Sequence, residues 1–162
     1  FIHLRYVDIS GNQLTDISSI NSLTHLLTLK CDRNKLPSAK LDELPYLQIA
    51  SFANNKIMDT EGISHPLLEH LNLSCKHLYP KYWKVKSTSI CKCIVLIPEN
   101  PVSDEDDYRI EVLITLRRLE RLDKDEYTDD ERQEAEEIYE QRRQEEAAAQ
   151  GTQEIIQTDE DD

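Results

Sequence analysis

One pattern recurs along the first half of the chain and constrains its fold more than any other feature. Each copy begins with a leucine and has apolar residues three and five positions later. An asparagine follows at the eighth position after the leucine, and another apolar residue at the tenth. The copies begin at Leu4, Leu26, Leu47 and Leu68. The asparagine position holds Asn12, Asn34, Asn55 and, in a degenerate fourth copy, Lys76. These positions are separated by 22, 21 and 21 residues, so each copy is one structural unit that stacks on the next.

Each copy has the chemistry of one coil of a leucine-rich repeat. The two alternating apolar residues place two side chains on one face of a short strand, and a single coil cannot bury that face alone. After the strand the backbone must turn, and a buried asparagine side chain can satisfy both the donors and the acceptors left inside the stack. The sequence predicts an α/β solenoid with short parallel strands on its concave face. Its structural ladder is predicted to hold Asn12, Asn34, Asn55 and Asn100.

The pattern divides the chain into five regions. We expect repeats over 1–78, an irregular degenerate repeat or an insertion over 79–93, and a last coil with a C-terminal cap over 94–127. The cap should contain a helix over about 105–117, with Asp104 to Asp107 capping its start. A capping box at Thr128 and Glu131 predicts a charged helix over 128–150. Gly151 is expected to end this helix, which leaves 151–162 as a disordered acidic tail.

The return segment of the first copy carries apolar residues at a spacing of three. This spacing favours a 3₁₀-like segment over a full α-helix. The residues are Leu14, Ile17, Ile20 and Leu23.

The net charge of −13 is unevenly distributed over the 162 residues. Residues 1–102 hold 11 Lys and Arg against 9 Asp and Glu, whereas residues 103–162 hold 8 against 23. The strongly acidic C-terminal part argues against nucleic acid as the main partner. No apolar run approaches the roughly 20 residues of a membrane span. We therefore expect a cytoplasmic protein without a membrane partner.

The sequence contains no constellation that indicates catalysis, and we expect neither an enzyme nor a cofactor. Its histidines are scattered, and it has neither a glycine-rich phosphate loop nor a metalloprotease motif. Cys91-x-Cys93 is too tight for the usual zinc arm, and Asp104-x-Asp106-Asp107 lacks the rest of a calcium loop. Cys31 lies at an apolar core position. No metal site and no small-molecule substrate are predicted.

The residues between the core positions of each strand should form columns on the concave face. The first holds Tyr6, Thr28, Ile49 and His70, and the second holds Asp8, Lys30, Ser51 and Asn72. The third holds Ser10, Asp32, Ala53 and Ser74. These columns form either an ordinary solvated face or a partly apolar docking face for a protein, as solenoids commonly use. We predict partner binding at Tyr6, Asp8, Thr28, Lys30, Asp32, Ile49, Ser51, His70 and Asn72.

The linking segments carry a more specific resemblance. They include Leu41-Asp42-Glu43-Leu44-Pro45-Tyr46, Asp59-Thr60-Glu61-Gly62-Ile63 and Leu119-Glu120-Arg121-Leu122-Asp123-Lys124. Together with the repeats they resemble the leucine-rich repeat-containing protein 23 family over about 1–78 and 94–148, and the cap resembles that of SDS22-type repeats. Residues 79–93 depart from the family pattern, and the family has several more repeats between the two parts.

This resemblance implies a non-enzymatic scaffold of the radial spokes in the axoneme of motile cilia and sperm flagella. Its partners would be other spoke proteins, and the charged helix would be either solvated or a second binding element. Two other functions remain open. One is an acidic chaperone for basic proteins such as histones, and the other is a phosphatase regulatory subunit of the SDS22 kind.

Overall fold

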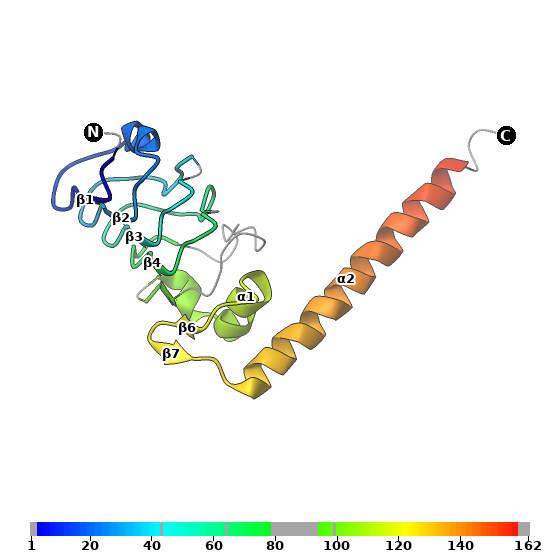
Figure 1. Ribbon diagram of the computed structural model, residues 1–162. Helices are drawn as coiled ribbons and strands as arrows, with labels where there is room; N and C mark the ends of the chain where they lie inside the picture. The colour runs from blue at the N-terminus through cyan, green and yellow to red at the C-terminus, as the bar shows by residue number, and fades with distance from the viewer. Residues whose placement is uncertain (1–2, 43, 64, 79–93, 99, 159–162) are drawn as a thin grey trace.

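The computed structural model describes residues 3–42, 44–63, 65–78, 94–98 and 100–158, and its repeats form the predicted leucine-rich repeat solenoid (Figure 1). A sheet of seven strands runs through the described residues in sequence order. The strands are β1 Tyr6–Asp8, β2 Thr28–Lys30, β3 Ile49–Ser51, β4 His70–Asn72, β5 Ile94–Leu96, β6 Arg121–Leu122 and β7 Asp125–Glu126. Neighbouring strands are parallel from β1 to β6, and only β7 runs antiparallel to its neighbour.

The strand register aligns the same repeat position in every coil. Val7 pairs with Leu29, Leu29 with Ala50, and Ala50 with Leu71. Of these, Leu29, Ala50 and Leu71 are almost completely buried, because the middle residue of each three-residue strand points into the stack. The flanking residues of each strand therefore point away from the core.

The first return segment contains the 3₁₀ helix η1, Ser18–Ser22. Its spacing of three places Ile17 and Ile20 on one side, and both are buried. The connections from β2 to β3 and from β3 to β4 contain no helix in their described residues. Pro37 and Pro45 disfavour a helix in the first connection, and Gly62 and Pro66 disfavour one in the second.

An asparagine ladder joins successive coils, as the turn chemistry requires. The Asn34 Nδ2 donates to the Ile9 carbonyl at 3.0 Å, and its Oδ1 accepts from the Leu14 N–H at 3.1 Å. Asn55 makes the equivalent bonds to Cys31 and Leu36 one coil further on. Asn100 bonds in the same way to Leu73 and Leu78. These three asparagines are buried, at 7%, 4% and 1% exposure.

The ladder differs from the sequence prediction in two places. Asn12 is exposed and its Nδ2 donates only to the Ile9 and Ser10 carbonyls of its own coil, because β1 is the edge strand of the described sheet. In the fourth coil Cys75, not Lys76, lies at the ladder position. The buried Cys75 thiol donates to the Phe52 carbonyl at 3.0 Å and also bonds the backbone of Ile57. Lys76 is exposed at a φ of 59°.

The C-terminal cap consists of the 3₁₀ helix η3, Pro101–Asp104, the helix α1, Tyr108–Thr115, and the β6–β7 hairpin. Val112 and Leu113 of α1 are buried and seal the end of the apolar stack. Asp123 then ties the cap to the last coil by accepting from the Ile97 N–H at 2.6 Å and the Tyr108 hydroxyl at 2.8 Å. The predicted acidic cap of this helix is wrong in one respect, since Asp107 makes no side-chain capping bond.

The charged helix α2, Asp129–Thr158, leaves the cap and extends away from the solenoid (Figure 1). Its capping box forms as predicted, with the Glu131 N–H donating to Thr128 Oγ1 and the Thr128 N–H donating to Glu131 Oε2. The prediction that this helix ends at Gly151 and gives way to a disordered tail is wrong for residues 151–158, because the helix continues to Thr158. A glycine inside a helix costs only about 1 kcal/mol, and the preceding Ala147 to Ala149 favour the helix.

The proposed irregular segment 79–93 lies outside the described residues. Cys91 and Cys93 fall within it, so the prediction that they do not bind zinc also lies outside them.

Candidate protein-binding surface

The outward side chains of β1 to β4 form the columns that the repeat pattern predicted. Strand pairing places Tyr6 beside Thr28, Thr28 beside Ile49, and Ile49 beside His70. Tyr6 is 55% exposed and Ile49 is 36% exposed. Two large side chains with apolar surface therefore face solvent in a single row, where an apolar partner side chain could be desolvated against them.

The second column carries charges of both signs. The Lys30 ammonium lies 5.7 Å from the centre of the Tyr6 ring, and the Tyr6 hydroxyl lies 3.4 Å from Asp8 Oδ2. Hydrogen bonds from Ser10 hold the pKa of the Asp8 carboxyl below its usual range. This part of the surface therefore presents an ion of each sign beside an aromatic ring at neutral pH.

Some of the predicted binding residues instead make hydrogen bonds within the solenoid, either between neighbouring coils or within one coil. Asp32 Oδ1 accepts from the Ser51 hydroxyl at 2.6 Å and from the Ala53 N–H at 2.8 Å. Asn72 Oδ1 accepts from both the N–H and the hydroxyl of Ser74. Asp32, Ser51 and Asn72 are half-buried, so they contribute more to the solenoid than to an exposed surface.

A second row of exposed side chains was missed by the sequence prediction. Each of its members precedes the first leucine of a repeat copy, and together they form a ridge at the start of strands β1 to β4: His3, His25, Tyr46 and Leu67. The rings of His3 and His25 are 5.3 Å apart, and those of His25 and Tyr46 stack at 6.1 Å. Tyr46 is 50% exposed and Leu67 is 45% exposed. Aligning the four copies one position further upstream would have revealed this ridge.

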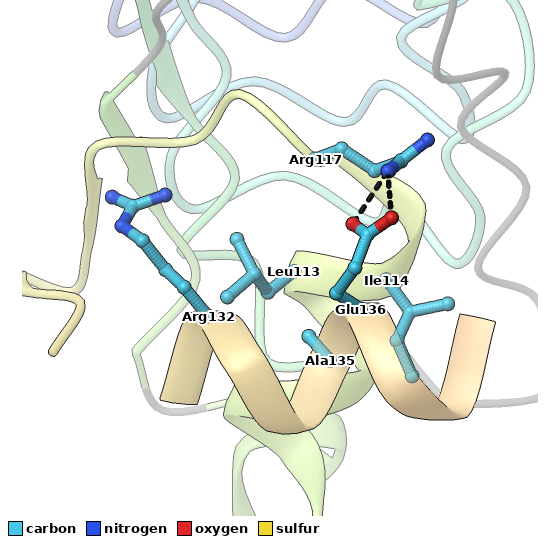
Figure 2. Close-up of a pocket in the computed structure, with 6 residues that line it drawn as sticks. All are labelled: Leu113, Ile114, Arg117, Arg132, Ala135 and Glu136. Carbon is cyan, nitrogen blue, oxygen red and sulfur yellow. Dashed lines mark hydrogen bonds and ion pairs between the residues drawn. The ribbon is translucent and has the colours of Figure 1, made fainter. Parts of the chain in front are cut away.

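The helix α2 contacts the cap through its first turns. Glu131 accepts from Arg109 Nε at 2.7 Å, and this bond lowers the pKa of the Glu131 carboxyl. Figure 2 shows Glu136 paired with Arg117, beside Ala135 and the cap residues Leu113 and Ile114. Ala135 is 4% exposed.

The opposite face of α2 is acidic. Helical spacing places four carboxylates on the side that faces away from the cap, and all are exposed: Asp130, Glu134, Glu137 and Glu145. Glu137 and Glu145 accept hydrogen bonds from glutamines one turn earlier, not from cations. This acidic stripe is a second surface, separate from the strand face.

The described thiols are buried within the core. Burial raises the pKa of Cys31 to about 12 and that of Cys75 to about 11, so both are protonated at neutral pH. The described residues hold no group of three or more side chains arranged to bind a metal. None of the helices that the structure describes combines the length and apolarity needed to cross a membrane.

Comparison with known proteins agrees with this architecture. A family model described as two copies of the leucine-rich repeat matches residues 2–46. A chain from the crystal structure of the Drosophila melanogaster SNF/U2A' complex superposes with a TM-score of 0.68 over 90% of this chain and 87% of that one. At 23% identity, this likeness shows the fold alone. The fold and the exposed strand face define a leucine-rich repeat protein of the protein-binding scaffold class.

Proteins of similar sequence show which leucine-rich repeat family the chain belongs to. Leucine-rich repeat-containing protein 23 from Bos taurus is 34% identical over 230 residues, which cover 85% of this chain and 67% of the relative. The Mus musculus protein of that name is 36% identical over the same shares. The chain belongs to the leucine-rich repeat-containing protein 23 family. The Homo sapiens protein is 73% identical over 73 residues, which are 45% of this chain but only 21% of that protein.

The two longer alignments also show a difference in length. Their 230 residues exceed the 162 residues of this chain, so part of each relative has no counterpart here.

Proposed function

We propose that this protein is a non-enzymatic scaffold of the radial spokes in the axoneme of motile cilia and sperm flagella. Membership of the leucine-rich repeat-containing protein 23 family supports this proposal, because the resemblance in the linking segments implies a spoke component. The partners are other spoke or axonemal proteins, and the location is the cytoskeleton of the cilium or flagellum. Nucleic acid, membrane and small-molecule substrates have no part in it.

The observation that carries the scaffold function is the exposure of Tyr6 and Ile49 in one row of the sheet. The ridge of His3, His25, Tyr46 and Leu67 adds aromatic and apolar area at the start of the same strands. Aromatic side chains provide a large contact area at a low cost in conformational entropy, which favours protein contacts. A partner that places apolar side chains across these two rows would bury both.

The acidic stripe of α2 supports a second contact of different character. Its carboxylates are exposed and suit a basic partner surface, whose attraction falls as salt shortens the Debye length from about 10 Å at 0.1 M to about 3 Å at 1 M. The strand-face contact, being partly apolar, should survive that change. A scaffold with two such contacts can join two partners.

Affinity purification of the tagged chain from ciliated cells tests the proposal. We expect radial spoke proteins to be the dominant partners, and we expect Ile49→Asp to lose a subset of them. Met58→Asp is the matched control, because Met58 is also an exposed apolar residue, at 51%, but lies outside the strands.

Two results would replace the proposal with another function. Predominant recovery of histones would indicate an acidic chaperone, and predominant recovery of phosphatase catalytic subunits would indicate a regulatory subunit of the SDS22 kind.

A further inference from the structure

The contact between α2 and the cap is mainly ionic. Three ion pairs join the helix to the cap. Arg109 holds Glu131 in the first turn of α2, and two pairs lie further along the helix, namely Arg117 with Glu136 and Arg142 with Glu111. The Arg142–Glu111 contact is 2.6 Å long with both side chains 50% exposed. The Arg117 and Glu136 side chains are 43% and 51% exposed. Solvent therefore reaches both pairs, and salt can screen them.

Apolar packing at this contact is thin. From Asp129 to Gln150, where burial is described, Ala135 is the one buried apolar residue of α2, whereas Ile138 and Tyr139 are half-buried. A gap of about 110 Å³ remains beside Leu113 and Ile114, where Figure 2 shows only the small Ala135 side chain between Arg132 and Glu136. Residues 143–150 are all exposed, and Arg142 makes the ion pair to the cap that lies furthest along the helix.

The connection between the cap and α2 places a pivot in the first turn of the helix. Tyr127, the residue before it, is buried and its hydroxyl donates to the Arg109 carbonyl at 2.9 Å. Thr128 itself is exposed and caps the helix through Glu131. Glu131 also pairs with Arg109, and Arg132 donates to the Leu119 carbonyl at 3.1 Å. The chain is thus fixed through the first turn of α2, and the rest of the helix depends on the two further ion pairs.

From these observations we propose that α2 is an arm held by an electrostatic latch, formed by the Arg117–Glu136 and Arg142–Glu111 pairs. When the latch opens, the arm pivots about its first turn, which Arg109 keeps on the cap through Glu131, and the acidic stripe and the distal helix can reach a partner at a different angle. Opening also uncovers the part of α1 around Leu113 and Ile114. Raised salt or a competing charged partner opens the latch, because either weakens the two pairs. This inference does not depend on the axonemal role.

Hydrogen–deuterium exchange of the whole chain tests the latch. In about 0.1 M salt we expect protection over residues 132–142 and over α1, and in about 1 M salt we expect that protection to fall while β2 to β4 stay protected. Arg142→Glu should raise exchange over 132–142 by about two- to fivefold, the range expected for one exposed ion pair. Arg117→Glu combined with Arg142→Glu should raise it by about tenfold or more.

The chain provides a matched control one residue away. Arg143 pairs only within α2, with Glu140 at 3.5 Å, so Arg143→Glu changes the same charge without touching the cap. We expect Arg143→Glu to leave α1 exchange unchanged. The exchanged pair Arg117→Glu with Glu136→Arg should restore protection, which a purely structural role of Arg117 would not allow.

Three results would overturn the latch. The first is equal effects of Arg142→Glu and Arg143→Glu on α1. The second is exchange that does not respond to salt. The third is loss of protection throughout β2 to β4 in the latch variants, which would make α2 part of the solenoid core.

Discussion

Replacing Asn55 by alanine tests the ladder at its central buried position. The side chain is 4% exposed, accepts from the Leu36 N–H at 3.0 Å, and donates to the Cys31 and Phe52 carbonyls at 2.9 Å each. Asn55→Ala leaves the Leu36 N–H and the Cys31 carbonyl without this partner inside the stack. Each buried unsatisfied group costs about 1–3 kcal/mol, and water that enters the vacated space recovers part of this. We expect a loss of about 2–4 kcal/mol in the free energy of unfolding.

The assay is urea unfolding followed by circular dichroism, together with a thermal melt. For a chain of this size the expected loss corresponds to a fall in Tm of roughly 5–12 °C. Asn12→Ala is the matched control, because Asn12 is exposed and bonds only its own coil, and it should change stability by less than about 0.5 kcal/mol. Equal effects of the two substitutions, or an unchanged Tm for Asn55→Ala, would refute the role of the ladder.

Two further perturbations follow from the structure. At Gly62, with a φ of +81°, a Cβ would lie 2.6 Å from Lys40 Cγ and 2.9 Å from Lys40 Cα, so Gly62→Ala should cost about 1–3 kcal/mol more than Gly11→Ala, whose nearest neighbour is 3.9 Å away. Thermal melts of the two variants measure this difference, and equal melting temperatures would contradict it. Because the pKa values of the Cys31 and Cys75 thiols are raised from 9.0 to about 12 and about 11, the unfolded chain releases their protons first. Their contribution to stability is complete below about pH 9 and is lost as the pH rises toward these values, by up to about 1.4 kcal/mol per pH unit for each thiol. A urea midpoint that is the same at about pH 8 and about pH 10.5 would contradict this.

The repeat pattern was enough to predict the solenoid, because its chemistry is local and repeated. Three copies place Leu29, Ala50 and their equivalents at the same strand position, and the parallel register follows from stacking identical coils. The capping box at Thr128 is also local, since its two hydrogen bonds join residues three apart. Features that depend on short-range spacing were therefore accessible from the sequence.

Features that depend on which of two neighbouring residues is buried, or on whether a helix continues past an unfavourable residue, were harder to predict from the sequence. The ladder position of the fourth coil is taken by Cys75 and not Lys76, because a small thiol can be buried and can bond the Phe52 carbonyl, whereas a lysine needs solvent for its charge. The helix α2 passes through Gly151 because the cost of one glycine is shared over a long helix. Both outcomes rest on small differences in free energy that no single-residue rule resolves.

The candidate surface was predicted only in part. The repeat register was enough to place Tyr6 and Ile49 in one outward row. It could not show that the Asp32 carboxylate would accept hydrogen bonds from the Ser51 hydroxyl and the Ala53 N–H. The ion pairs of α2 join residues as far apart as Glu111 and Arg142, a distance along the chain at which sequence spacing carries no information.

Binding of the purified chain to isolated axonemes tests the central claim most directly. If the protein is an axonemal scaffold that uses its strand face, Ile49→Asp should weaken cosedimentation about tenfold or more, the loss expected when a charge is buried at an apolar contact. Met58→Asp, at an exposed apolar position outside the strands, should bind like the unmodified chain. Circular dichroism should show both variants folded. Equal binding by folded Ile49→Asp and Met58→Asp, or no binding of the unmodified chain to axonemes, would contradict the account.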